Sequence, residues 1–238
     1  MKASDQGPIL VVAAHPDDEV LGCGGTVGAA TSRGAEAHLL ILANGIAARY
    51  EDVKAHAEEI NAAQAALRED AAKAAKILGF ASHAILDFPD NRLDTVARMG
   101  LAHAIDGVIE KIRPGTIYTH HPGDYNWDHT ACFDAVMMAA RPSPGEHAPA
   151  RLLTFEVLSS TERAWQNAAD AFHPNVYVDI ARGIDKKKLA MKTYRSEHRD
   201  YPHPRSLEGI EYLARKRGLE IGVEYAEAFH LVREIAKA

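Results

Sequence analysis

Cysteine, long apolar runs and clustered positive charge are all scarce in this chain of 238 residues. Its two cysteines, Cys23 and Cys132, are too few for a disulfide framework or a thiolate metal cage. No run approaches the roughly 20 apolar residues that span a bilayer. The apolar run near the N-terminus has about six residues and is shorter than the core of a signal peptide. We therefore expect a cytoplasmic protein without a membrane span.

The charge balance argues against nucleic acid as a partner. The formal net charge is -6, whereas binding to phosphates needs a clustered basic surface. The short basic groups at 186–188 and 215–217 stand among acidic residues, which predicts solvated helix faces. With 47% hydrophobic and 25% charged residues, the composition is that of an ordinary globular protein. The length suits one domain over 1–238 with a substantial core.

Short apolar runs alternate with longer segments of helical period. This pattern predicts an α/β fold, a Rossmann-like doubly wound and mostly parallel sheet with helices on both faces. We expect strands at 8–14, 37–44, 83–88, 115–121, 152–158 and 175–180, and helices at about 18–33, 52–79, 95–113, 129–140 and 184–198. The segment 224–233 is compatible with a strand or a short helix. In the common order 3-2-1-4-5, strands one and four are neighbours, and ligands bind between their carboxyl ends.

Chemistry-bearing residues follow both of those strands. The first runs into "HPDDE" (15–19) and the fourth into "HHPGDYNWDH" (120–129). Adjacent carboxylates raise one another's pKa unless a cation or hydrogen-bond donors hold them. His15 and Asp18 are three residues apart at the entry to a helix, a spacing that brings both to one side. If His129 completes the set, the ligands are two imidazoles and one carboxylate. This set suits a catalytic Zn²⁺ that keeps one position open for water. It equally describes the ligand triad of non-haem Fe(II) enzymes.

Asp17 lies between the two candidate ligands and favours hydrolysis over iron chemistry. A zinc-bound water has a pKa of about 7, and a neighbouring carboxylate that is not a ligand suits a general base. An ordinary group of first-turn helix acids explains one or two of the carboxylates, Glu19 among them. It does not explain His15 beside them, nor a second His/Asp cluster on the neighbouring strand.

The segment "AHPDDEVLGCGGT" (14–26), followed about a hundred residues later by a strand and a "DH" pair, resembles the PIG-L/LmbE family of zinc-dependent N-deacetylases. The resemblance runs from residue 8 to the final "AEAFHLVR". It implies a Rossmann-like fold, zinc at His15, Asp18 and His129, and Asp17 as general base. Family members remove acetyl from N-acetylglucosamine attached to inositol or malate. The implied substrate is therefore an N-acetylated sugar or sugar conjugate, and a homo-oligomer is also implied.

The second motif departs from the family pattern. Many members read "HPDH", with a histidine that polarises the substrate or donates a proton, whereas "NWDH" places Asn126 there. An asparagine can donate a hydrogen bond to a developing oxyanion, worth about 3 kcal/mol, but it delivers no proton. We expect Asp17 to pass the water's proton to the leaving amine, with His121 or His203 as alternatives. We expect Asp128 to orient a zinc-ligating ring.

Loops on the same side of the sheet hold the candidate substrate contacts. Arg49 and Asp90 follow strands two and three, where the resembled family holds its sugar, and His121 is a third candidate. Arg92 and Arg205 are weaker ones. We expect recognition to involve the loops after strands two, three and four and the segment near 195–210. Two other functions remain open: a non-catalytic sugar- or nucleotide-binding protein on the same fold, and an Fe(II) enzyme on the same triad.

Overall fold

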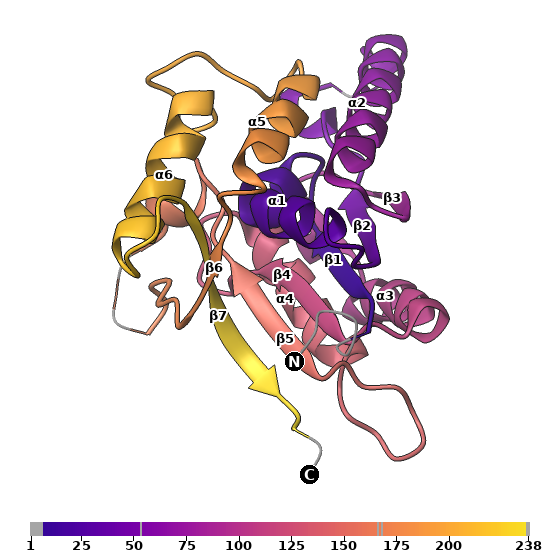
Figure 1. Cartoon of the computed structure of the whole chain (residues 1–238). Helices are drawn as coiled ribbons and strands as arrows, with labels where there is room; N and C mark the ends of the chain where they lie inside the picture. Colours follow the sequence, from indigo (N-terminus) through magenta and orange to yellow (C-terminus); the bar gives the residue numbers. More distant parts are fainter. Residues whose placement is uncertain (1–6, 53, 166, 168, 237–238) are drawn as a thin grey trace.

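The structure is a computed structural model that describes residues 7–52, 54–165, 167 and 169–236. A seven-stranded sheet forms its centre, with the strands arranged as in Figure 1. The strand order is β3-β2-β1-β4-β5-β7-β6. The strands are β1 (Ile9–Ala13), β2 (Ala37–Ala43), β3 (Ser82–Phe88), β4 (Thr116–His120), β5 (Arg151–Phe155), β6 (Val176–Asp179) and β7 (Ala226–Glu234). Strands β1 to β5 pair in parallel, whereas β7 is antiparallel to β5 and β6. The predicted mostly parallel, doubly wound sheet is confirmed.

Helices cover both faces of this sheet (Figure 1). They are α1 (Asp18–Thr31), α2 (Ala57–Leu78), α3 (Arg98–Ile112), α4 (Trp127–Ala139), α5 (Ile184–Thr193) and α6 (Leu207–Leu219). Side chains alternate between the two faces along a strand. In β1, Val11 accordingly joins the core beneath α1, α2 and α5, while Leu10 and Val12 join the core beneath α3 and α4. No helix of the described residues is both long enough and apolar enough to cross a membrane.

Several element boundaries differ from the sequence-based expectation, mainly in the last third of the chain. The helix expected at 184–198 ends at Thr193, because Tyr194 turns into the interior and its hydroxyl donates to Glu19 Oε1 at 2.6 Å. No bounds are predicted for helix α6 from the sequence, which indicates only a helix face at 215–217. Ser206 caps α6 by accepting the backbone N–H of Gly209 at 2.9 Å. The ambiguous segment 224–233 forms strand β7 from Ala226 onward.

Two of the basic residues expected on solvated helix faces are buried, so that expectation is wrong for them. Lys187 on α5 donates to Glu227 Oε1 at 2.6 Å, and Arg217 on α6 donates to both carboxylate oxygens of Glu156 at 2.7 Å. Their helices pack over the sheet and bring each cation against an acid far away in sequence. A buried cation is tolerated when it is paired in this way.

Helix α1 lies very close to the sheet, and a glycine permits this approach. A Cβ atom built on Gly22 would stand 2.3 Å from the ring of Phe155 on β5. The close packing brings the first turn of α1 to the carboxyl ends of the central strands. Residues 15–18 of the "HPDDE" segment therefore face the crevice where β1 and β4 are neighbours.

Candidate active site

A cavity of about 260 Å³ opens at the carboxyl ends of the strands. Its walls come from the segments that follow five strands and from the connection between α5 and α6, as expected for ligand binding at the point where the strand order reverses. The polar residues lining it are His15, Asp17, Asp18, Arg49, Asp90, Asn91, Tyr125, Asn126, His129, Ser159, Ser160, Glu197 and Arg205. Most of the residues singled out from the sequence are therefore brought together.

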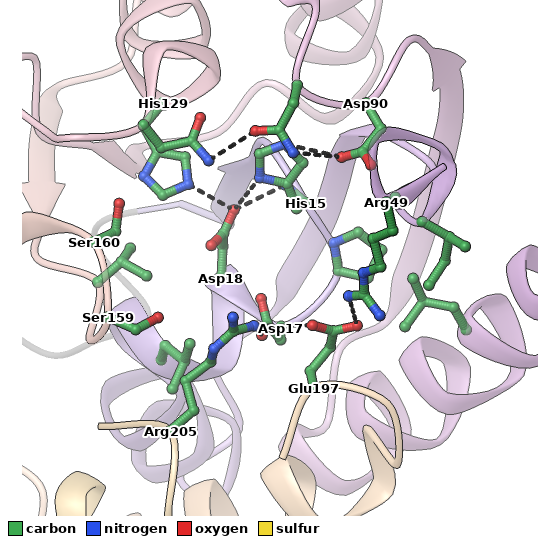
Figure 2. A pocket seen from close by; sticks show the side chains of 18 of the residues that line it. His15, Asp17, Asp18, Arg49, Asp90, His129, Ser159, Ser160, Glu197 and Arg205 are labelled. Carbon is green, nitrogen blue, oxygen red and sulfur yellow. Dashed lines mark hydrogen bonds and ion pairs between the residues drawn. The ribbon is translucent and has the colours of Figure 1, made fainter. Parts of the chain in front are cut away.

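The three expected metal ligands converge in this cavity, as Figure 2 shows. His15 follows β1, Asp18 begins α1, and His129 lies in the first turn of α4. His15 Nδ1 and His129 Nε2 each lie 3.4 Å from Asp18 Oδ2. One ligand atom from each residue lies within 4.8 Å of the others, so the set fits a single cation. Two imidazole nitrogens and one carboxylate oxygen form a donor set suited to Zn²⁺ or Fe²⁺.

The electrostatics of the cluster favour an ionised carboxylate between the rings. Burial alone would raise the pKa of Asp18, but the contact with His129 holds it well below its usual value. An ionised carboxylate is the form that binds a cation. The protonation state of Asp18 therefore agrees with its place in the ligand set.

A second carboxylate lies behind each histidine. His15 Nε2 donates to Asp128 Oδ2 at 3.0 Å, and the fully buried Asp128 also accepts the backbone N–H of Leu93 at 2.9 Å. His129 Nδ1 lies 3.1 Å from Asp124 Oδ1. Carboxylates placed in this way orient a ligating ring and fix its tautomer.

Asp124 was missed in the sequence, although it stands five residues before His129 in the quoted segment. Burial would raise its pKa, but contacts with His129, Ser160 and Thr161 lower it to about 2. Both hydroxyls come from the segment after β5. Those partners are distant in sequence, so the local pattern carried no signal that separated Asp124 from an ordinary loop acid.

Of the two neighbouring histidines, His121 is the candidate from the sequence, whereas His120, to which the sequence assigns no role, is the one that contacts the cluster. His121 does not line the cavity: its Nε2 donates to the backbone carbonyl of Asp170 at 2.7 Å. His120 is fully buried, and its ring stacks on His129 with centroids 3.9 Å apart. Adjacent residues of a strand point to opposite sides, so only one of this pair can face the cluster. The Nε2 atom of His120 accepts the backbone N–H of Ala14 at 2.8 Å, which commits its lone pair.

Asp17 lines the cavity beside the ligands and is held at its backbone and at its side chain. Its φ of 105° lies in the left-handed region, which costs a non-glycine residue about 1–3 kcal/mol. The backbone N–H donates to Glu19 Oε2 at 3.1 Å, and Arg205 donates to Oδ2 at 3.0 Å. Burial raises the pKa of Asp17 well above its usual value, and Arg205 opposes this effect.

The side chain of Asn126 makes two hydrogen bonds within the protein. Its Oδ1 caps α4 by accepting the backbone N–H of Asp128 at 2.9 Å, and its Nδ2 donates to Asn91 Oδ1 at 3.2 Å. Because the amide carries two N–H groups, a second donor remains at the cavity wall. The expected contact with an oxyanion stays a prediction.

Arg49 and Asp90 both reach the cavity from the loops in which they were expected. Arg49 ends a short 3-10 helix, Ala47–Arg49, and forms an ion pair with Glu197. Asp90 Oδ2 accepts the backbone N–H of Ala48 at 3.1 Å. The sequence does not single out Glu197 and indicates Arg205 only as a weaker candidate, because the irregular segment around them gives no periodic signal. Arg92 and His203 are not among the lining residues.

Fold and cavity together define a doubly wound α/β protein with a candidate metal centre at the carboxyl ends of its strands. The model of the PIG-L family, described as GlcNAc-PI de-N-acetylase, matches residues 10–140. The match covers more than half of the chain, which therefore belongs to this family.

Named relatives differ in the reactions that their descriptions give. A probable N-acetyl-alpha-D-glucosaminyl L-malate deacetylase 2 of Bacillus cereus is 28% identical over 192 residues, covering 79% of this chain and 83% of that protein. The diacetylchitobiose deacetylase of Thermococcus kodakarensis is 26% identical over 207 residues, covering 82% and 71%. The structure of GalB, a 4-carboxy-2-hydroxymuconate hydratase of Pseudomonas putida KT2440, has a TM-score of 0.76 at 22% identity and covers 98% of both chains. This last likeness establishes the fold alone.

Proposed function

We propose that this protein is a zinc-dependent N-deacetylase that removes acetyl from an N-acetylated sugar or sugar conjugate. One observation carries the proposal: His15, Asp18 and His129 converge in a polar cavity directly beside the non-ligand carboxylate of Asp17. The family and the two deacetylase relatives support this reaction class. The fold by itself does not select it, because a hydratase shares the fold.

His15, Asp18 and His129 would hold the cation, with Asp128 and Asp124 behind the two rings. A zinc ion bound there supplies a Lewis acid for the amide carbonyl and lowers the pKa of water. Zn²⁺ is proposed over Fe²⁺ because a base beside the ligand set serves hydrolysis. Elemental analysis of protein prepared with both metals available decides between them.

The protein's own residues account for the proton transfers. Asp17 accepts a proton from the attacking water as its oxygen bonds to the carbonyl carbon. Asn126 donates an N–H to the developing oxyanion. Asp17 then passes the proton to the amide nitrogen, the C–N bond breaks, and acetate and the free amine leave. His121 and His203 lie outside the cavity wall, which supports Asp17 for both transfers.

Substrate binding is proposed for the side of the cavity formed by the loops after β2 and β3, where Asp90 Oδ1 lies 3.5 Å from His15 Nε2. Arg49 and Asp90 offer a donor and an acceptor for sugar hydroxyl groups, and Asp90 is buried at the cavity wall. Residues from β1 through the α5–α6 connection line one cavity, which supports a single domain over 1–238. Cytoplasmic location and a homo-oligomeric state stay predictions.

The test is an acetate-release screen of the zinc-loaded protein over N-acetylated sugars, sugar nucleotides and glycoconjugates, with diacetylchitobiose among them. We expect Asp17→Asn to keep its zinc and to lose about 10²–10⁴-fold in kcat, and His129→Ala to lose both zinc and activity. His103→Ala on α3, an exposed histidine, is the matched control. Acetate release by Asp17→Asn at the wild-type rate would refute the base. Tight sugar binding without acetate release by the wild type would favour the binding-protein function.

A further inference from the structure

Arg205 reaches the cavity from the connection between α5 and α6, residues 194–206 (Figure 2). Its Nη1 donates both to Asp17 Oδ2 at 3.0 Å and to Glu197 Oε2 at 2.9 Å. The side chain is only 26% exposed. A cation fixed between two carboxylates at the edge of the candidate site calls for a functional explanation.

Asp17 needs an external partner to keep its carboxylate in place. It lies between His15 and Asp18 in the sequence, and the neighbouring carboxylate of Asp18 repels it. Its backbone is fixed in the left-handed region, where the N–H is bound by Glu19. These contacts fix the Cα position but leave rotation about the side-chain bonds. Within the described residues, Arg205 contacts only the Oδ2 atom of Asp17. The other carboxylate oxygen of Asp17, Oδ1, therefore stays available to a water molecule.

Glu197 fixes Arg205 in turn. This carboxylate is 4% exposed and accepts from Arg205, from Arg49 and from the hydroxyl of Ser196 at 2.8 Å. Arg205 is therefore anchored on one side before it contacts Asp17 on the other. Hydrogen bonds between ionised partners are the strong ones, and a guanidinium keeps its charge throughout the working pH range.

We infer that Arg205 is a positioning residue for the general base: held by Glu197, it keeps the carboxylate of Asp17 aimed at the cavity. The inference rests on the proposed function, in which Asp17 moves the protons. The competing role is direct binding of an anionic group of the substrate. The geometry favours positioning, because two carboxylates of this chain already compensate the charge of Arg205.

The experiment compares Arg205→Lys and Arg205→Ala with wild type in the zinc-loaded protein. A misplacement of about 1 Å in a catalytic group can cost 10²-fold, so we expect Arg205→Ala to lose about 10²-fold in kcat with KM within about threefold. Arg205→Lys retains more activity, because an ammonium can still donate to Oδ2. Added guanidinium ion restores part of the kcat of Arg205→Ala. Zinc content stays at the wild-type level in both variants.

Arg195→Gln is the matched control. Arg195 lies in the same connection and pairs with the buried carboxylate of Asp70, with Nη2 2.9 Å from Oδ1, but it does not line the cavity. An equal loss of kcat in this variant would mean that any loosening of the connection is harmful, and the inference would be overturned. A rise in KM with unchanged kcat in Arg205→Ala would make Arg205 a substrate contact and overturn it as well.

Crystal structures of the zinc-loaded wild type and Arg205→Ala separate this inference from the proposed function. If the wild type releases no acetate from any substrate, the proposed function fails, and the two structures still test the positioning. A displaced Asp17 carboxylate in Arg205→Ala supports the inference. An Asp17 side chain in its wild-type place refutes it, whatever the activity.

Discussion

Asp128→Asn should weaken zinc binding without removing any ligand. Asp128 Oδ1 accepts the N–H of Leu93 in a buried contact, and Oδ2 accepts from His15 Nε2 in a partly buried one. In the variant the amide oxygen stays with Leu93, because that backbone N–H donates to Oδ1 at 2.9 Å and needs an acceptor there. The amide nitrogen then faces His15 Nε2, and two donors oppose each other. The ring relieves this conflict by moving its proton to Nδ1, the atom that faces Asp18.

The expected loss follows from that tautomer change. A protonated Nδ1 has no lone pair for a cation, so binding requires the unfavourable tautomer. Substitutions behind a ligating histidine typically cost 10- to 100-fold in metal affinity, which corresponds to about 1.4–2.8 kcal/mol. Because the variant keeps one of the two hydrogen bonds and the volume of the side chain, the fold itself should persist.

Competition for Zn²⁺ against a chromophoric chelator measures the affinity, and urea unfolding of the chelated protein checks the fold. Asp134→Asn is the matched control, because this residue lies on the same helix with its side chain 43% exposed. The reasoning is refuted if Asp128→Asn binds zinc within twofold of wild type. An equal weakening in Asp134→Asn would refute it too, since that residue does not touch the cluster.

Two further predictions concern stability. Lys187→Met should lower the free energy of unfolding, measured with urea at neutral pH, by about 3 kcal/mol, because it leaves Glu227 buried without its cation. Lys192 is exposed on the same helix, and Lys192→Met should leave the free energy of unfolding nearly unchanged. Burial raises the pKa of Glu197, but Arg49 and Arg205 hold it below its usual 4.5. The ionised carboxylate therefore stabilises the fold above pH 4.5, and this contribution is lost as the pH falls through the lower pKa of the folded state. The difference in unfolding free energy between wild type and Glu197→Gln should therefore shrink on acidification, and a constant difference from about pH 6 to pH 3 would contradict this.

Local patterns in the sequence were sufficient for the order of the first five strands and for placing His15 and Asp18 among the candidate metal ligands. The choice of His129 rested on the resemblance to the PIG-L/LmbE family. Strands alternating with helices predict a parallel sheet, and in such a sheet the ends of the first and fourth strands meet. The "HPDDE" segment and the "DH" pair stand at those two ends, so His15, Asp18 and His129 were expected near one another. Their convergence follows from topology, which hydrophobic periodicity reveals over many residues.

Contacts between elements that are distant in sequence could be identified only from the tertiary structure. Asp17 and Arg205 are separated by 188 positions and meet only because the α5–α6 connection folds over the cavity. His120 rather than His121 faces the cluster because the pleat of β4 allows one of two neighbours to point there, and a shift of one residue reverses the choice. The burial of Lys187 likewise depends on how α5 packs. Periodicity determines which side of an element is apolar, but the partner of each polar side chain depends on where the other elements come to lie.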